Sequence, residues 1–102
     1  MTSRDLIVGI VLDDAGLTLE QIAGACAVDR TWVVTHVSEG YLPVVGDRES
    51  NWHFTAAALN RARRIRAIER DFDAVPELAA LVADMLDEMD ALRTRLNRGG
   101  LS

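Results

Sequence analysis

The sequence predicts a mostly helical protein with a helix-turn-helix body, a short β wing and a long C-terminal helix. Three observations predict it. Two short stretches with helical apolar spacing flank a tight turn between residues 18 and 40. A turn-rich segment then leads into the alternating residues Trp52, His53 and Phe54. From Pro76 to Asn97 the helical spacing of apolar residues continues unbroken, which favours one long helix.

Length and composition fit one structural domain. The chain has 102 residues, of which 49% are hydrophobic and 26% charged, which is ordinary for a globular protein. Within that domain we expect a winged helix-turn-helix body over residues 1–75 and a coiled-coil helix over residues 76–98. Residues 99–102, which begin with two glycines, are expected to form a flexible tail.

The first elements are short. Residues 5–12 are rich in Ile, Val and Leu and predict a strand, with a helix as the weaker option. Thr18 can cap the next helix, because Gln21 stands three residues later, as in a capping box. That helix should end near Ala25.

The second helix of the pair should begin after Asp29, whose side-chain oxygen suits an N-terminal cap, and should stop at Gly40. Residues 44–51 carry turn formers, so together with residues 52–54 they predict a hairpin, the wing, with Trp52 and Phe54 in the core.

Two helices complete the chain. One should run from Thr55 to about Asp71, with its apolar residues inward and most arginines outward. Residues 73–76 break it, and Pro76 is acceptable in the first turn of the last helix.

The last helix carries a heptad seam, which we name the α-seam. Its apolar residues recur at alternating spacings of four and three: Leu78, Val82, Met85, Met89, Leu92 and Leu96. The helix is long for so small a protein, so we expect the seam to form a homodimer. Acidic residues precede basic ones along it, which favours antiparallel pairing. The alternative is that the seam packs within one monomer.

Composition excludes several classes of protein. The formal charge is -5, so nonspecific attraction to nucleic acid is weak unless charge is segregated. A lone cysteine, Cys26, cannot form an internal disulfide, and no apolar run is long enough to cross a bilayer, so we expect a cytoplasmic protein. His36, His53 and Cys26 lack metal-site spacing, and no nucleophile or phosphate-loop motif occurs. We expect no enzyme activity, no metal and no cofactor.

Basic residues gather in one place. The helix that follows Thr55 carries the basic cluster of Arg61, Arg63, Arg64, Arg66 and Arg70. The candidate nucleic-acid contacts are Arg30, on the earlier helix, and from this cluster Arg61, Arg63, Arg64 and Arg66. Acidic residues at the end of the same helix, Glu69, Asp71 and Asp73, could neutralise much of this cluster, which would then be a solvated helix face.

The order of elements resembles the MerR superfamily from residue 17 onward. Within it the chain looks most like chaperone modulators of the CbpM type, through residues 17–19 (LTL), 37–43 (VSEGYLP), 52–54 (WHF) and 86–88 (LDE). DNA-binding MerR proteins usually carry an arginine six residues before the glycine, where this chain has Val34, and another two residues before the wing aromatic, where it has Trp52. Both departures point away from DNA.

The resemblance implies a protein partner, the J-domain of a DnaJ-like co-chaperone of the curved-DNA-binding protein A type, whose activity such modulators inhibit. An acidic protein suits the basic helix of a J-domain. The candidate contact residues are Glu39, Tyr41, Asp84, Asp87, Glu88 and Asp90. The alternatives are a MerR-type transcriptional regulator that binds DNA as a dimer, and an adaptor with another protein partner.

Overall fold

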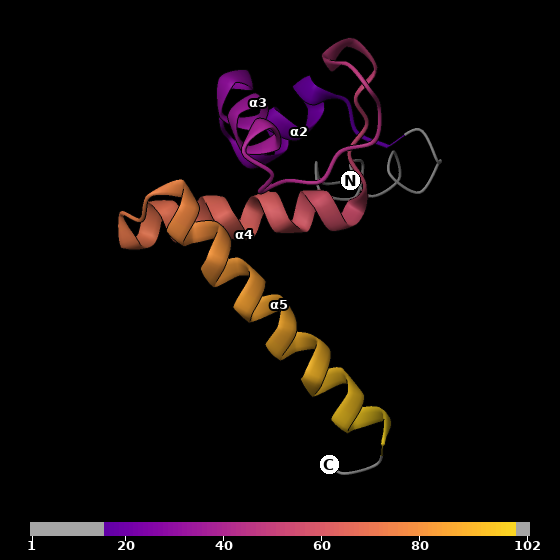
Figure 1. Cartoon of the computed structure of the whole chain (residues 1–102), viewed down its shortest axis with the longest axis vertical. Coiled ribbons are helices and arrows are strands. Elements are labelled where there is room, and N and C mark those ends of the chain that lie inside the picture. Colours follow the sequence, from indigo (N-terminus) through magenta and orange to yellow (C-terminus); the bar gives the residue numbers. More distant parts are fainter. Residues whose placement is uncertain (1–15, 100–102) are drawn as a thin grey trace, which may run out of the picture. The chain divides into compact units, whose positions relative to one another are not determined.

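A computed structural model describes residues 16–99 of the chain. The strand predicted at residues 5–12 and the tail residues 100–102 lie outside the described residues. The elements follow in the order α2 (Leu19–Cys26), α3 (Arg30–Ser38), the 3-10 helix η1 (Glu49–Asn51), α4 (Ala56–Phe72) and α5 (Pro76–Arg98) (Figure 1). The chain forms two compact units, with the boundary between Arg64 and Ile65.

Helix α2 begins as the sequence predicts. The Thr18 hydroxyl accepts a hydrogen bond from the Gln21 backbone at 3.1 Å, and the Gln21 side chain accepts one from the Thr18 backbone at 2.9 Å. This capping box satisfies two backbone donors that a helix N-terminus leaves without partners. The helix ends at Ala27, whose left-handed backbone (φ 55) turns the chain toward α3.

Helix α3 has no side-chain cap at its start, and it ends at a glycine. Asp29 occupies the predicted N-cap position, but its side chain makes no capping hydrogen bond. At the other end Gly40 is left-handed (φ +81), and the Tyr41 N–H donates to the His36 carbonyl oxygen at 2.9 Å. With the Gly40 N–H donating to Val37, this closes the helix in a Schellman motif, so the predicted glycine stop is confirmed.

The predicted β wing is wrong as a strand hairpin, since residues 16–99 contain no strand. The segment is a loop with η1 at its tip, joined by the isolated antiparallel bridge of Val45 with His53. Phe54 makes a second isolated antiparallel bridge, with Leu17. Each bridge is a single residue pair, and neither extends into a ladder of strand pairs.

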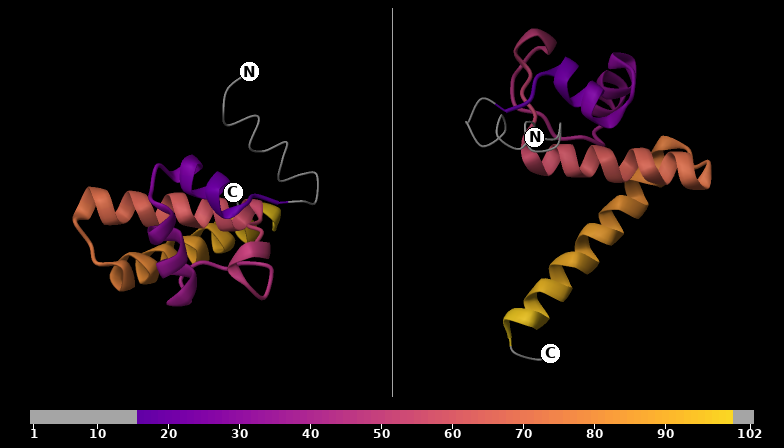
Figure 2. Two further views of the ribbon diagram at one scale, coloured as in Figure 1. Left: turned by 90° about the horizontal axis from the view of Figure 1, so that it is seen from above. Right: turned by 180° about the vertical axis from the view of Figure 1, so that it is seen from behind.

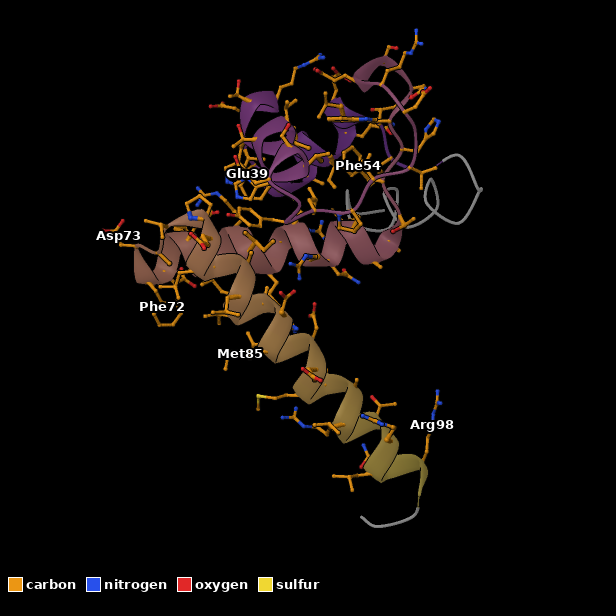
Figure 3. All side chains as sticks on the ribbon, viewed as in Figure 1. Glu39, Phe54, Phe72, Asp73, Met85 and Arg98 are labelled. Atoms are coloured by element: carbon orange, nitrogen blue, oxygen red, sulfur yellow. The ribbon has the colours of Figure 1, made fainter. Side chains whose placement is uncertain are left out.

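The core of the first unit lies among α2, α3, the loop and the first half of α4. Phe54, Leu17 and Ile22 are completely buried there, and Trp52 packs against them, half-buried. The Trp52 and Phe54 rings meet edge to face, with centroids 6.3 Å apart. The assignment of these two aromatics to the core is confirmed, and Figure 3 shows Phe54 between the helix pair and the loop.

The second unit consists of the end of α4, a short connection and α5. Asp73 adopts a left-handed backbone (φ 50) after α4, and Pro76 occupies the first turn of α5. Figures 1 and 2 show the first turns of α5 beside the last turns of α4. Ile65 and Ile68 are buried on α4, whereas on α5 the buried residues are the alanines 79, 80 and 83.

Candidate functional site

The start of α3 carries an ion-pair clamp, which we name the Arg30 clamp. One terminal nitrogen of Arg30 lies 2.6 Å from a Glu20 carboxylate oxygen on α2, and the other lies 2.6 Å from Glu49 on η1. The hydrogen bond to Glu49 is the largest cause that raises the pKa of Arg30. Two carboxylates surround one guanidinium, so this part of the surface has a net negative charge.

The clamp borders a cleft of about 290 Å³ between the start of α2 and the loop. Beside the clamp residues, the cleft is lined by Thr18, Leu19, Ser50, Trp52 and His53. This arrangement is not visible in the sequence, because Glu20 and Glu49 stand ten and nineteen residues from Arg30. Only the presence of several acidic residues around an isolated arginine could have suggested it.

The outer face of α3 is uncharged. Thr31, Thr35 and Ser38 are exposed, while Val34 packs partly buried against the core. Val34 therefore contributes to the stability of this body. With Arg30 held in its clamp, α3 offers a phosphate backbone no unpaired cation.

An aromatic group occupies the inner side of α3. The Trp32 and His36 rings stack with centroids 3.7 Å apart, and Tyr41 meets His36 edge to face at 5.9 Å. His36 is 2% exposed, and its Nδ1 lies 2.7 Å from the Trp32 carbonyl oxygen. Tyr41, a candidate contact residue, is thus half-buried next to the exposed Glu39, and the two lie together at the end of α3.

The arginines of α4 differ in their surroundings. The Nε of Arg61 donates a hydrogen bond of 2.5 Å to the Tyr41 carbonyl oxygen, which ties α4 to the end of α3. Arg63 lies close enough to Cys26 to act on its thiol, while Arg64 and Arg66 are half-buried. Near the end of the helix Arg70 pairs with Asp71 at 3.0 Å. At least part of the basic cluster therefore serves the protein's own structure.

Cys26 is buried at the end of α2. Burial raises the pKa of its thiol, and the charge of Arg63 opposes this rise. A neutral thiol is a poor nucleophile, so Cys26 has the environment of a core residue. Over residues 16–99 we find no group of three or more His, Cys, Asp or Glu side chains that could hold a metal ion.

The α-seam lies on the exposed side of α5. Leu78, Met85 and Met89 are 50, 58 and 51% exposed, and Leu92 and Leu96 are 49 and 54% exposed. Val82 is half-buried. Because a helix turns 100° per residue, the seam faces away from the side that carries the buried alanines 79, 80 and 83. The described chain thus covers α5 on its alanine side and leaves its large apolar side chains in water.

The acidic candidates of α5 flank this seam. Asp84, Asp87, Glu88 and Asp90 are all exposed. Asp84 and Glu88 lie along one edge of the seam, whereas Asp87 and Asp90 lie nearer the alanine side. They belong to the second unit, and Glu39 and Tyr41 belong to the first.

No helix in the described part of the chain is long and apolar enough to cross a membrane.

A family described as MerR HTH family regulatory protein matches residues 17–98, which is most of the chain. No curated protein and no solved structure matches the sequence significantly.

Proposed function

The chain belongs to the MerR helix-turn-helix family of regulatory proteins, and from this premise we propose that it is a chaperone modulator. In this proposal it binds the J-domain of a DnaJ-like co-chaperone of the curved-DNA-binding protein A type and blocks its activity by competition. It acts as a stoichiometric partner in the cytoplasm and catalyses no reaction.

The observation that carries the proposal is the state of α3, the helix that would read DNA. Its one arginine, Arg30, lies between two carboxylates at 2.6 Å each, and Val34 packs against the core. A helix in a DNA groove needs cations for the phosphates around it. The uncharged exposed face of α3, with acidic residues beside it, is better suited to contact a protein than DNA.

Charge supports the J-domain as that surface. The protein carries a formal charge of -5, and J-domains present a basic helix to their chaperone. Complementary charge raises the association rate and orients the encounter. Glu39 at the end of α3 and Asp84, Asp87, Glu88 and Asp90 on α5 are the acidic contact residues that we propose, with Tyr41 as an aromatic contact.

We also propose that the protein works as a homodimer through the α-seam. Six apolar positions along α5 are exposed or half-buried in one chain, and such a continuous face in water is unfavourable. A second copy of the same helix would bury it. This favours pairing between chains over packing within one monomer.

A second candidate function is transcriptional regulation by DNA binding, which most directly fits the family description. Arg48 on the loop favours it, since its side chain is 75% exposed and its nearest carboxylate, that of Asp47, is 4.0 Å away. Arg63, Arg64 and Arg66 would then be further phosphate contacts.

The test is a calorimetric titration of the full chain with the purified J-domain of the co-chaperone from the same organism, and in parallel with a promoter-sized DNA duplex. We expect saturable one-to-one binding per chain with the J-domain and no heat with DNA. Absence of J-domain binding, together with tight and salt-sensitive DNA binding, would overturn the proposal in favour of the regulator.

A matched pair of variants locates the protein contact. Glu39→Gln removes a carboxylate beside Tyr41, and Asp47→Gln removes an exposed one at the loop. We expect a several-fold loss of J-domain affinity from the first variant and little change from the second. Equal losses from both would mean that net charge, and not the end of α3, determines binding.

A further inference from the structure

The cleft beside the Arg30 clamp already holds one guanidinium group, that of Arg30. One terminal nitrogen of Arg30 donates to Oε1 of Glu20 and the other to Oε1 of Glu49, each at 2.6 Å. The two carboxylates come from different elements, α2 and η1, and converge on one planar cation. Within residues 16–99 neither carboxylate makes another hydrogen bond or ion pair, so each keeps its second oxygen as a free acceptor.

An aromatic ring forms part of the wall of the same cleft. Trp52 lines the cleft, and its ring meets that of Phe54 edge to face in the core. Because Trp52 is half-buried, its ring is held by the core and still reaches the cleft. The face of an indole ring attracts the cations of arginine and lysine side chains. The volume of about 290 Å³ is enough for the end of one such side chain.

The loop fixes Glu49 before any ligand binds. Asn51 donates from Nδ2 to the Asp47 carboxylate at 2.7 Å, and its Oδ1 accepts from the Arg48 N–H at 3.2 Å. Gly46 lies against Asn51, since a Cβ at position 46 would be 2.7 Å from the Asn51 oxygens. These contacts order the tip that carries η1, so a ligand has little left to order when it binds.

Charge disfavours an anion as the occupant of the cleft. The charged groups that line it are two carboxylates and one guanidinium, which leave a net negative charge. A phosphate would have to displace Glu20 or Glu49 from Arg30, and the displaced carboxylate would stay nearby and repel it. A second cation instead meets the carboxylate oxygens that Arg30 leaves free.

We propose that this cleft binds an arginine or lysine side chain of the protein partner, which rests on the proposed function for the identity of that partner, a J-domain. The cation lies between the free oxygens of Glu20 and Glu49, next to the Trp52 ring. The cleft adjoins the first residue of α3, and Glu39 follows the last one. At 1.5 Å per residue α3 is about 13 Å long, so a basic helix along it can place one cation at each end.

The first experiment tests the cleft without the partner. The isotopically labelled full chain is titrated with N-acetyl-arginine amide at constant ionic strength, and the indole N–H signals of Trp32 and Trp52 are followed by NMR. N-acetyl-citrulline amide is the control, because it has nearly the same shape and no charge. We expect the arginine probe to move the Trp52 signal, with a dissociation constant on the order of tens of millimolar, and to leave that of Trp32 in place. A fixed Trp52 signal, an equal shift with citrulline or a larger shift with sodium phosphate would overturn the inference.

The second experiment tests whether the partner uses the cleft. Ser50→Lys places a cation of the chain's own beside the carboxylates, since Ser50 lines the cleft. Ala57→Lys makes the same change of charge at an exposed position of α4 that does not line the cleft. We expect Ser50→Lys to weaken J-domain binding about three- to tenfold more than Ala57→Lys does. Equal losses from the two variants would show that the partner does not enter the cleft.

The inference and the proposed function fail in different ways. A natural chain that binds the arginine probe but no J-domain would refute the proposed function and leave the cleft as a site for a cationic side chain. A chain that binds the J-domain, with no response to the arginine probe and equal losses from Ser50→Lys and Ala57→Lys, would refute the inference alone.

Discussion

The two units of the molecule bury their apolar residues to very different extents. In the helix-turn-helix body Phe54 and Leu17 are fully buried, and even the polar His36 is 2% exposed. Along α5 the buried residues are alanines, while Met85 and Leu96 are 58 and 54% exposed. The body completes its own core within one chain. Helix α5 carries large apolar residues that the rest of the described chain leaves exposed. We therefore propose that a second copy of the helix covers them.

The two phenylalanines give the largest test of this contrast. Phe54 is fully buried, and Phe72, at the end of α4, is 76% exposed (Figure 3). Phe54→Ala should lower the free energy of unfolding by about 3–5 kcal/mol, because it leaves a cavity in the body. Phe72→Ala should cost less than about 0.5 kcal/mol. Urea unfolding followed by circular dichroism measures both, and a large loss from Phe72→Ala would show that another surface covers it.

A second test acts on α5. Met85→Lys combined with Met89→Lys places four like charges at the centre of the proposed pairing face, so the dimer should dissociate to monomer. The body should stay folded, since both methionines are exposed in the single chain. Light scattering after size-exclusion chromatography measures the mass. Ala91→Lys, at an exposed position outside the seam, is the control, and an unchanged mass of the double variant would refute the seam as an interface.

Local features of the body were predictable from sequence, and pairing between distant residues was not. The Thr18 capping box and the Gly40 stop depend on residues within one helical turn, and both occur as expected. The wing failed as a strand hairpin because, although Trp52, His53 and Phe54 alternate as a strand does, the backbone pairs of this segment are isolated bridges. The spacing of apolar residues indicates which side chains face the core, but it does not indicate which distant segment a residue pairs with.

The candidate contacts show the same limit. Arg30 was predicted as a possible nucleic-acid contact because it is basic and stands at the start of α3. Its clamp to Glu20 and Glu49 follows only from the fold, which brings α2 and η1 to the same place. The α-seam is the opposite case, since all of its residues belong to one helix and their common face follows from the helical repeat alone.

Substitution of two glycines in the body should change the free energy of unfolding by intermediate amounts. Gly46 in the loop has φ +120, and a Cβ there would lie 2.7 Å from the Asn51 carbonyl and side-chain oxygens. Gly46→Ala should therefore cost about 1–3 kcal/mol. Gly24, within α2, has open space around it, so Gly24→Ala should stabilise the body by about 0.5–1 kcal/mol. Thermal unfolding measures both, and equal signs would contradict this description of the loop.

Substitutions at the N-terminal caps of α2 and α3 should change the free energy of unfolding by less. Thr18→Ala removes the hydroxyl that caps α2, which should cost about 1 kcal/mol, while the Thr18 backbone N–H that donates to the Gln21 side chain remains. Asp29→Ala should cost less than half of that, because the Asp29 side chain makes no capping bond to α3. Urea midpoints of the two variants test the difference. A larger loss at Asp29 would mean that its charge at the helix N-terminus matters more than the hydrogen bond at Thr18.

Cys26 provides the smallest effect and tests how closed the body is. Since burial raises the pKa of its thiol in the folded chain, the unfolded chain loses this proton at lower pH. The contribution of Cys26 is therefore fully present below the ordinary thiol pKa of about 8.5 and declines as pH rises above it. Urea midpoints at pH 7.5 and 9.5 should fall further for the natural chain than for Cys26→Ala, which has no thiol to titrate. Equal falls would mean that water reaches Cys26, and the body would then be as incompletely covered as α5.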